Sequence, residues 1–224
     1  LYKRYINMKA SITIPTDLSE ITLSDYQKFL AVSELYPDNH NFLAQKIIEI
    51  FCHVKPENVR LIKAVDADSI VRKITKVLES KPKDLVENFK LNGVEYWFHP
   101  DLDDMSFGEY IDADSYLADI KEIHASMNVF YRPIKNKVGN KYTLESYDPV
   151  KKDRLLNMPM DAVISSMEFF FLLSNQLSNV MATYFNDPKN QQALKVDSAL
   201  DGDGMDQFSY LLEKTLTKLK IQLP

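Results

Sequence analysis

The sequence contains very little cysteine and glycine. Its single cysteine, Cys52, excludes an intramolecular disulfide, and its place in the apolar run 47–54 predicts a buried thiol with a structural role. Only five of the 224 residues are glycine, and no glycine-rich pattern for binding phosphates or dinucleotides is found. The hydrolase patterns HExxH and GxSxG are also missing. These absences argue against a nucleotide-dependent enzyme and against the common hydrolases.

The sequence also lacks an excess of positive charge and an uninterrupted apolar run. The net charge is −5, and basic and acidic residues are mixed along the chain without segregation, whereas nucleic-acid binding needs a basic stripe. The start of the chain lacks the apolar core of a secretory signal. The best candidate for a membrane span, 163–185, is interrupted by Glu168 and three amides, which are costly in hydrocarbon. We therefore expect a soluble cytoplasmic protein with neither a nucleic-acid nor a membrane partner.

The chain begins with Leu1 instead of methionine. Either a UUG start codon or a true start at Met8 would explain this, and both would indicate a compact prokaryotic or viral genome. A trimmed sequence is the alternative.

Apolar side chains recur with helical spacing over most of the first third of the chain. The pattern predicts a helix over 25–33 capped by Ser24, one from Asp38 or Asn39 to about His53, a short one over 57–63 with Pro56 in its first turn, and one that starts at Asp66 or Asp68. Before them, the alternating β-branched residues of 11–15 predict a short strand ended by Pro15.

The middle of the chain changes to a β pattern. Asn92 and Gly93 separate the runs 85–91 and 94–98, and this dipeptide accepts the positive φ angles of a type I′ hairpin turn. Further along, we predict a short helix capped by Ser106, a longer helix over 116–131 ended near Arg132 and Pro133, and a polar turn followed by a strand within 135–147.

The most apolar part of the chain is 159–185, which predicts a helix of roughly 26 residues, about 39 Å long, with Pro159 in its first turn. Successive residues of a helix diverge by roughly 100°, so one buried face cannot cover Phe169, Phe170 and Phe171 together. With Leu173, they are our candidate partner-binding residues. The alternative is a central helix surrounded by its own domain.

Together, these patterns predict a single domain over 1–224 that is mainly α with a small β component (α+β). Its helical body would surround the long central helix near 159–185, with the β-hairpin at 85–98. Residues 1–10 and 186–204 are expected to be flexible, and helical spacing resumes over 205–223.

One acidic turn places a histidine next to three aspartates, at His99, Asp101, Asp103 and Asp104. These side chains could bind a metal ion, but a site needs further ligands, and a solvated loop is the simpler interpretation. The second acidic turn, 201–206, does not fit the register of a calcium loop. His124 lies in a predicted amphipathic helix, where a structural histidine is commoner than a catalytic base. We therefore predict no catalytic residue, no metal site and no cofactor.

Several segments resemble, in their order, the baseplate and tail-assembly-chaperone-like proteins of tailed bacteriophages. The resemblance covers 12–185 and is carried by ITIPTDLSEITL at 12–23, MSFGEYID at 105–112, MNVFYRPI at 127–134, KYTLESY at 141–147 and MPMDAVISSMEFFF at 158–171. It implies a small protein that acts in the cytoplasm of an infected bacterium and also, if it is a structural component, in the virion. Its partners would be tape-measure, tail or baseplate proteins, and it could also form a homo-oligomer.

Two other functions stay open at this point. One is a metal-dependent hydrolase that uses His99, Asp101 and Asp103. The other is a phage protein that binds and regulates a host protein, which would share the binding chemistry of an assembly protein and differ only in its partner.

Overall fold

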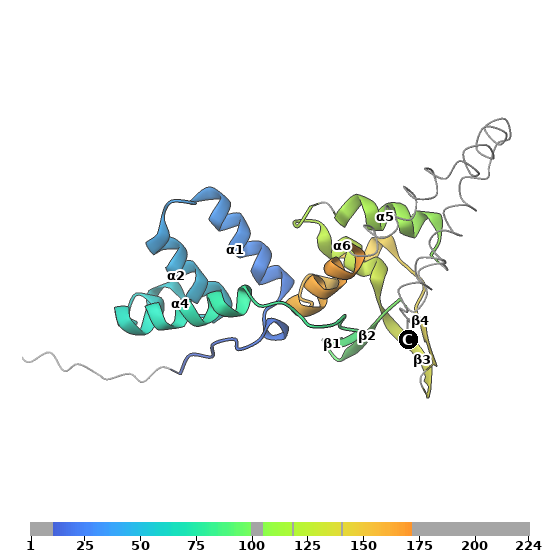
Figure 1. Cartoon of the computed structure of the whole chain (residues 1–224), viewed down its shortest axis with the longest axis horizontal. Coiled ribbons are helices and arrows are strands. Elements are labelled where there is room, and N and C mark those ends of the chain that lie inside the picture. The colour runs from blue at the N-terminus through green and yellow to red at the C-terminus, as the bar shows by residue number, and fades with distance from the viewer. Residues whose placement is uncertain (1–10, 100–104, 118, 140, 172–224) are drawn as a thin grey trace, which may run out of the picture. The chain divides into compact units, whose positions relative to one another are not determined.

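The computed structural model describes residues 11–99, 105–117, 119–139 and 141–171 (Figure 1). The predictions for 1–10, 186–204 and 205–223, the end of the long helix, and residues Asp101, Asp103, Asp104 and Leu173 lie outside the described residues. What is described is mainly helical and contains one small antiparallel sheet, which confirms the predicted α+β class.

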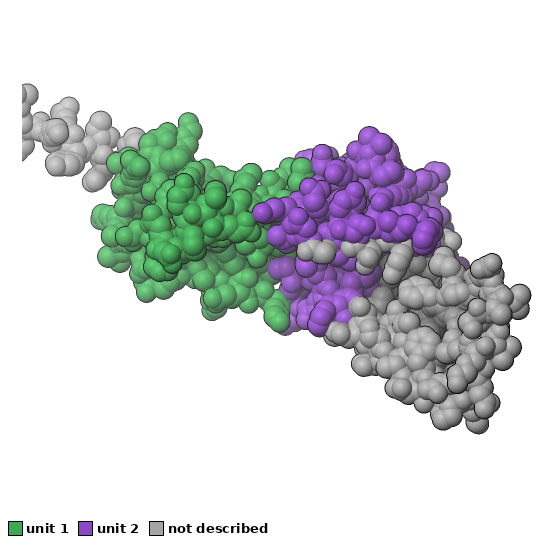
Figure 2. All heavy atoms as spheres, turned by 90° about the horizontal axis from the view of Figure 1, so that it is seen from above, with its two compact units in different colours: residues 1–81, 156–161 green, residues 82–155, 162–224 purple. Residues whose placement is uncertain are grey.

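The chain divides into two compact units, shown in different colours in Figure 2. Unit 1 comprises 1–81 and 156–161, and unit 2 comprises 82–155 and 162–224. That the two units form one domain stays a prediction.

Unit 1 is built from helices. They are the 3₁₀ helix η1 (Leu18–Glu20), α1 (Leu23–Leu35), α2 (His40–Phe51), α3 (Pro56–Val59) and α4 (Ala64–Leu78). α2 packs against α1, α3 and α4, and the buried side chains of Ile48, Phe51 and Ile74 contribute to the core there. Residues 11–16, predicted to include a strand, form none. In the described part of this unit, an isolated antiparallel β-bridge joins Thr22 to Pro159.

The helix starts of unit 1 agree only partly with the predictions. Asn39 caps α2, since its Oδ1 accepts from the Phe42 N–H at 3.1 Å. Thr22, rather than Ser24, caps α1 by accepting from the Asp25 N–H at 3.1 Å. α4 begins before the predicted aspartates, after Lys63, which forms no side-chain cap. Pro56 does occupy the first turn of α3, although that helix is shorter than predicted.

Unit 2 combines the sheet with helices. Its elements are β1 (Asn88–Leu91), β2 (Val94–Phe98), α5 (Phe107–Leu117), α6 (Ile123–Phe130), β3 (Tyr131–Val138), β4 (Lys141–Leu144) and the 3₁₀ helix η3 (Pro149–Leu155). The strands are antiparallel in the order β1-β2-β3-β4. All eight residues of α6 are buried, and α6 packs against α5 and η3.

The predicted hairpin is confirmed, with Leu91 paired to Val94 across the turn. Asn92 and Gly93 have φ angles of 52° and 79°, as a type I′ turn requires. The first strand is shorter than the predicted run, because β1 begins at Asn88.

The predicted helix over 116–131 is wrong. α5 ends at Leu117, α6 runs from Ile123 to Phe130, and Tyr131 already belongs to β3. The carboxylate of Asp119 accepts from the Lys121 N–H at 2.9 Å, a local turn that competes with helix continuation. Pro133 disfavours a helical conformation of the preceding residue and lies inside β3, opposite Tyr96.

The predicted polar turn after Pro133 is also displaced, because β3 continues to Val138. The turn is at Gly139, whose φ is 62°, and β4 follows as the predicted strand of this region. η3 was not predicted. The long helix begins at Met160, directly after Pro159, and is described to residue 171.

Replacing Gly93 with alanine should lower the free energy of unfolding by about 1 kcal/mol, because an alanine at positive φ is strained. A Cβ at this position would meet no atom within 4 Å, so the cost is one of backbone conformation. Gly108→Ala is the matched control, since its Cβ also meets nothing and it lies in α5 without a positive φ. Urea unfolding of both variants measures the difference, and equal effects would contradict the turn assignment.

Candidate functional site

Three of the four predicted partner-binding residues, Phe169, Phe170 and Phe171, lie on the helix 160–171, beside a cluster of buried aromatic side chains. Phe98 ends β2, Phe130 ends α6, and both are at most 2% exposed. The Phe170 ring stacks on Phe130 with ring centroids 3.9 Å apart, and Phe169 meets Phe98 edge to face at 5.6 Å. These contacts place Phe169 and Phe170 against the core of unit 2.

Phe171 differs from its two neighbours, because it is 67% exposed while Phe169 and Phe170 are half-buried. The divergence of successive helical side chains explains the difference, since two neighbours can reach one cluster and the third points elsewhere. Of the four predicted residues, the structure therefore brings two into the core and leaves one accessible. Leu173 lies outside the described residues.

A hydroxyl group ties the start of β3 to the same helix. The Tyr131 hydroxyl donates to the Val86 carbonyl at 2.6 Å and lies 3.4 Å from the Ala162 carbonyl. The Val86 N–H in turn donates to the Ser165 hydroxyl at 3.1 Å. The aromatic cluster is thus held on its helical side by polar contacts, which fix the helix that carries Phe171.

A second group of side chains forms a buried ionic cluster in unit 2. Arg132 of β3 and Glu109 of α5 form an ion pair with N and O atoms 2.5 Å apart, and both side chains are about nine-tenths buried. Glu109 also closes a capping box, because the Ser106 N–H donates to its carboxylate at 2.6 Å while the Glu109 N–H donates to the Ser106 hydroxyl at 3.3 Å. The predicted cap at Ser106 is thereby confirmed.

The electrostatics of this pair follow from its burial and its partners. Burial alone would raise the pKa of the Glu109 carboxyl, but hydrogen bonds from Ser106 and the charges of Arg132 and His99 bring that pKa below its ordinary value. Burial lowers the pKa of the Arg132 guanidinium, and the charge of Glu109 opposes this change. Glu109 is therefore the main compensation for the burial of Arg132, whereas the burial of Glu109 is compensated first by the Ser106 hydrogen bonds and then by the charge of Arg132.

Further polar side chains extend the cluster. The Tyr147 hydroxyl donates to the Asp112 carboxylate at 2.7 Å, and burial together with this hydrogen bond raises the pKa of Tyr147. On the neighbouring side, Arg154 of η3 donates to the Asn128 amide oxygen at 2.5 Å and pairs with Glu145 at 3.9 Å. The cluster therefore connects α5, α6, β3, η3 and the segment that follows β4.

The sequence-predicted metal ligands are only partly described. His99 is buried at the end of β2, and its backbone N–H donates to the Phe130 carbonyl at 2.7 Å. His99 is among the groups that lower the pKa of the Glu109 carboxyl, which places it near the ionic cluster. Within the described ranges, no group of three or more His, Cys, Asp or Glu side chains could hold a metal ion.

Two further predictions concern single residues. Cys52 is buried as predicted, and burial raises the pKa of its thiol. His124 is buried in α6, and its Nε2 lies 3.1 Å from the Asp153 carboxylate, as expected for a structural histidine. Its Nδ1, also buried, has no hydrogen-bond partner among the described residues.

The sequence reasoning missed Glu109, Arg132, Asp112 and Tyr147. One signal was readable in advance, because Ser106 and Glu109 have the spacing of a capping box. Nothing local in the sequence indicates that Glu109 meets Arg132, since that contact depends on how α5 packs beside β3. The described side chains of the cluster bind one another, and the arrangement is suited to holding five segments together.

Comparison of the chain with protein-family models, with curated proteins and with solved structures found no match. In the part of the chain that is described, no helix is both long enough and apolar enough to cross a membrane.

Replacing Glu109 with glutamine should lower the free energy of unfolding at pH 7 by about 3 kcal/mol, because it leaves the Arg132 charge buried without its counter-charge. The folded-state pKa of Glu109 lies below the unfolded value of about 4.3, so its stabilisation is present above that value. It is lost as the pH falls through the folded-state pKa.

Urea unfolding at pH 7 and pH 3 therefore distinguishes the wild type from Glu109→Gln, since acidification should lower the free energy of unfolding of the wild type by more. The exposed Glu79 provides the control, because Glu79→Gln should change the free energy of unfolding by less than about 0.5 kcal/mol. Equal losses on acidification in the wild type and Glu109→Gln would contradict the role given to this pair.

The aromatic contacts predict different effects for two neighbouring phenylalanines. Phe170→Ala should lower the free energy of unfolding by about 2 to 3 kcal/mol, because it removes the stacking on Phe130 and leaves a cavity. Phe171→Ala should change it by less than about 0.5 kcal/mol, since that side chain is mostly exposed. Chemical denaturation of the full chain measures both values, and a larger loss for Phe171→Ala would contradict the arrangement.

Proposed function

We propose that this chain acts in bacteriophage tail morphogenesis, as an assembly chaperone or as a baseplate or connector component, and that it works by binding other proteins without catalysis. The observation that carries the proposal is the exposure of Phe171 beside two phenylalanines that pack inward. The resemblance of the segments within 12–185 to tail-assembly and baseplate proteins supports the same role.

A large aromatic side chain on a fixed helix is a suitable anchor for a partner. Aromatic residues are enriched among the few interface residues that dominate binding free energies. Because Phe169 and Phe170 hold the helix through the aromatic cluster, Phe171 is presented with little conformational freedom left to lose. The mostly exposed Phe171 is thereby available for binding.

A second exposed apolar pair supports a protein-binding role. Phe107 and Ile111 are 61% and 45% exposed and lie four residues apart on α5, which places them on one side of that helix. Another residue of α5, Glu109, is instead buried inside unit 2, where it pairs with Arg132. Exposed apolar side chains grouped on one helix face are typical of interaction surfaces.

As a chaperone, the chain would bind an apolar helical partner, such as a tape-measure protein, until tail polymerisation displaces it. As a baseplate or connector component, it would keep its tail or baseplate partners in the virion. Both versions place its action in the cytoplasm of the infected bacterium, and self-association is compatible with either. Neither involves a nucleic acid, a membrane or a cofactor.

Affinity capture of the tagged full chain from infected cells, followed by mass spectrometry, tests this proposal. Tail, baseplate or tape-measure proteins should be recovered with the wild type, and Phe171→Ser should reduce their recovery by about tenfold, as loss of an interface anchor does. Val150→Ser is the matched control, because Val150 is 89% exposed and lies in η3.

Recovery of the chain without any tail component would contradict the proposed function. Mass spectrometry of purified particles then separates its two versions. A chaperone should be absent from the particle, and a structural component should be present in a fixed copy number.

A further inference from the structure

The sheet of unit 2 ends at β4. In the order β1-β2-β3-β4, this strand pairs with β3 on one side only, and no described strand pairs with its other side. An edge strand presents backbone N–H and C=O groups in the repeat that another extended chain can pair with. β4 therefore offers main-chain hydrogen bonds to a partner.

The hairpin formed by β3 and β4 carries positive charge without acidic residues. Lys135, Lys137 and Lys141 are exposed, and none forms an ion pair with a described residue. The remaining cation of β3, Arg132, is paired with Glu109. The mixture of basic and acidic residues along the chain as a whole therefore does not extend to this edge.

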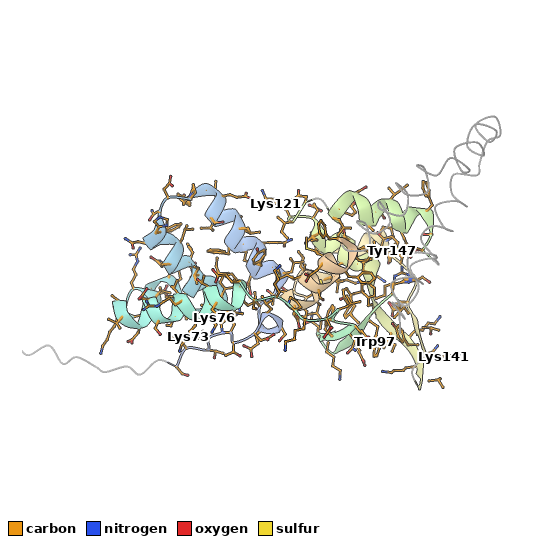
Figure 3. All side chains as sticks on the ribbon, viewed as in Figure 1. Lys73, Lys76, Trp97, Lys121, Lys141 and Tyr147 are labelled. Carbon is orange, nitrogen blue, oxygen red and sulfur yellow. The ribbon has the colours of Figure 1, made fainter. Side chains whose placement is uncertain are left out.

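Aromatic contacts brace the hairpin. The Lys137 ammonium lies 3.9 Å from the centroid of the Trp97 ring, and the Trp97 and Tyr142 rings are 4.6 Å apart. The Tyr142 hydroxyl donates to the Phe98 carbonyl at 2.9 Å, which connects β4 to β2 across β3. Figure 3 labels Trp97 and Lys141 in this region. An edge that is already ordered loses little conformational entropy when a partner binds.

Charge decides which partner fits this edge. A second copy of the same edge would bring lysines next to lysines, and exposed lysines on edge strands normally prevent such self-pairing. A nucleic acid would suit the lysines but has no backbone that matches the hydrogen-bonding repeat of a strand. An extended peptide with acidic side chains satisfies both the backbone groups and the ammonium groups.

We propose that the outer edge of β4 binds an extended, acid-rich segment of a partner protein, which adds to the sheet as a further strand. Its carboxylates would lie beside Lys141 on β4, one strand spacing of about 4.8 Å away, and would be attracted by the ammonium group of Lys135 on β3, one strand further from the added segment. The inference rests on the proposed function, because it assumes that the chain binds other proteins and specifies one surface that does so.

Fluorescence anisotropy with the full chain tests the edge directly. The probe is a labelled peptide of about eight residues in which glutamate and valine alternate, a length suited to one strand. It should bind, and Lys135→Glu combined with Lys141→Glu should weaken it by at least about tenfold, since both positions then repel the peptide. Lys137 is left unchanged because it packs on Trp97.

The matched control is Lys73→Glu combined with Lys76→Glu on α4 of unit 1, which makes the same charge change at exposed lysines elsewhere (Figure 3). It should leave peptide affinity within about twofold of the wild type, allowing only for long-range charge. Circular dichroism confirms that both double variants are folded. Equal loss of binding in the two double variants would overturn the proposal.

A second peptide separates strand pairing from simple charge attraction. It carries the same number of glutamates but has proline in place of valine, and proline cannot donate to a strand ladder. It should bind at least about tenfold more weakly. Equal affinity of the two peptides, tighter binding of a single-stranded oligonucleotide of equal charge, or no binding of the first peptide would each overturn the proposal.

The outcome is independent of the test of the proposed function. If tail components are captured equally by the wild type and by the double variant that combines Lys135→Glu with Lys141→Glu, the edge proposal fails while the proposed function stands. If no tail component is captured but the acidic peptide binds as expected, the proposed function fails and the edge is a peptide-binding site of another process.

Discussion

The buried ion pair between Arg132 and Glu109 is the constraint on which the described part of unit 2 depends. It joins the first turn of α5 to the beginning of β3, at the point where the chain leaves the fully buried helix α6. A charge in such a position is tolerated only with a counter-charge, so α5 and β3 cannot shift apart independently. The pair thus helps to hold α5, which carries the exposed Phe107 and Ile111, beside β3.

Local chemistry made part of this structure readable from the sequence. The Asn92-Gly93 turn and the place of Pro56 in the first turn of α3 each depend on the residue itself and were predicted correctly, and Asn39 is one of the two caps predicted for α2. The helix over 116–131 was wrong because its apolar spacing said nothing of the turn at Asp119 or of the strand pairing that recruits Tyr131. Periodicity reports which side chains are buried, but not the partner that buries them.

The candidate site was likewise predictable only where it depends on local sequence. The sequence indicated that one helix face cannot bury Phe169, Phe170 and Phe171 together. In the structure, two of them pack inward and the third is exposed. Which two pack inward depended on where Phe98 and Phe130 lie, and that required the fold. The positive charge of β3 and β4 was not predicted for a similar reason. Basic and acidic residues are mixed over the whole chain, and the local excess of lysine is seen only when the two strands are paired.

The segment 156–161 belongs to unit 1, although it follows most of the described part of unit 2 in the chain. The Leu23 N–H donates to the Met158 carbonyl, the Ser24 N–H to the Leu156 carbonyl, and the Met160 N–H to the Ile21 carbonyl, at 2.7 to 2.9 Å. During synthesis, the amino-terminal helices emerge long before these partners do. The start of α1 therefore stays incompletely hydrogen-bonded until the chain has been synthesised through residue 160, after residues 82–155 of unit 2.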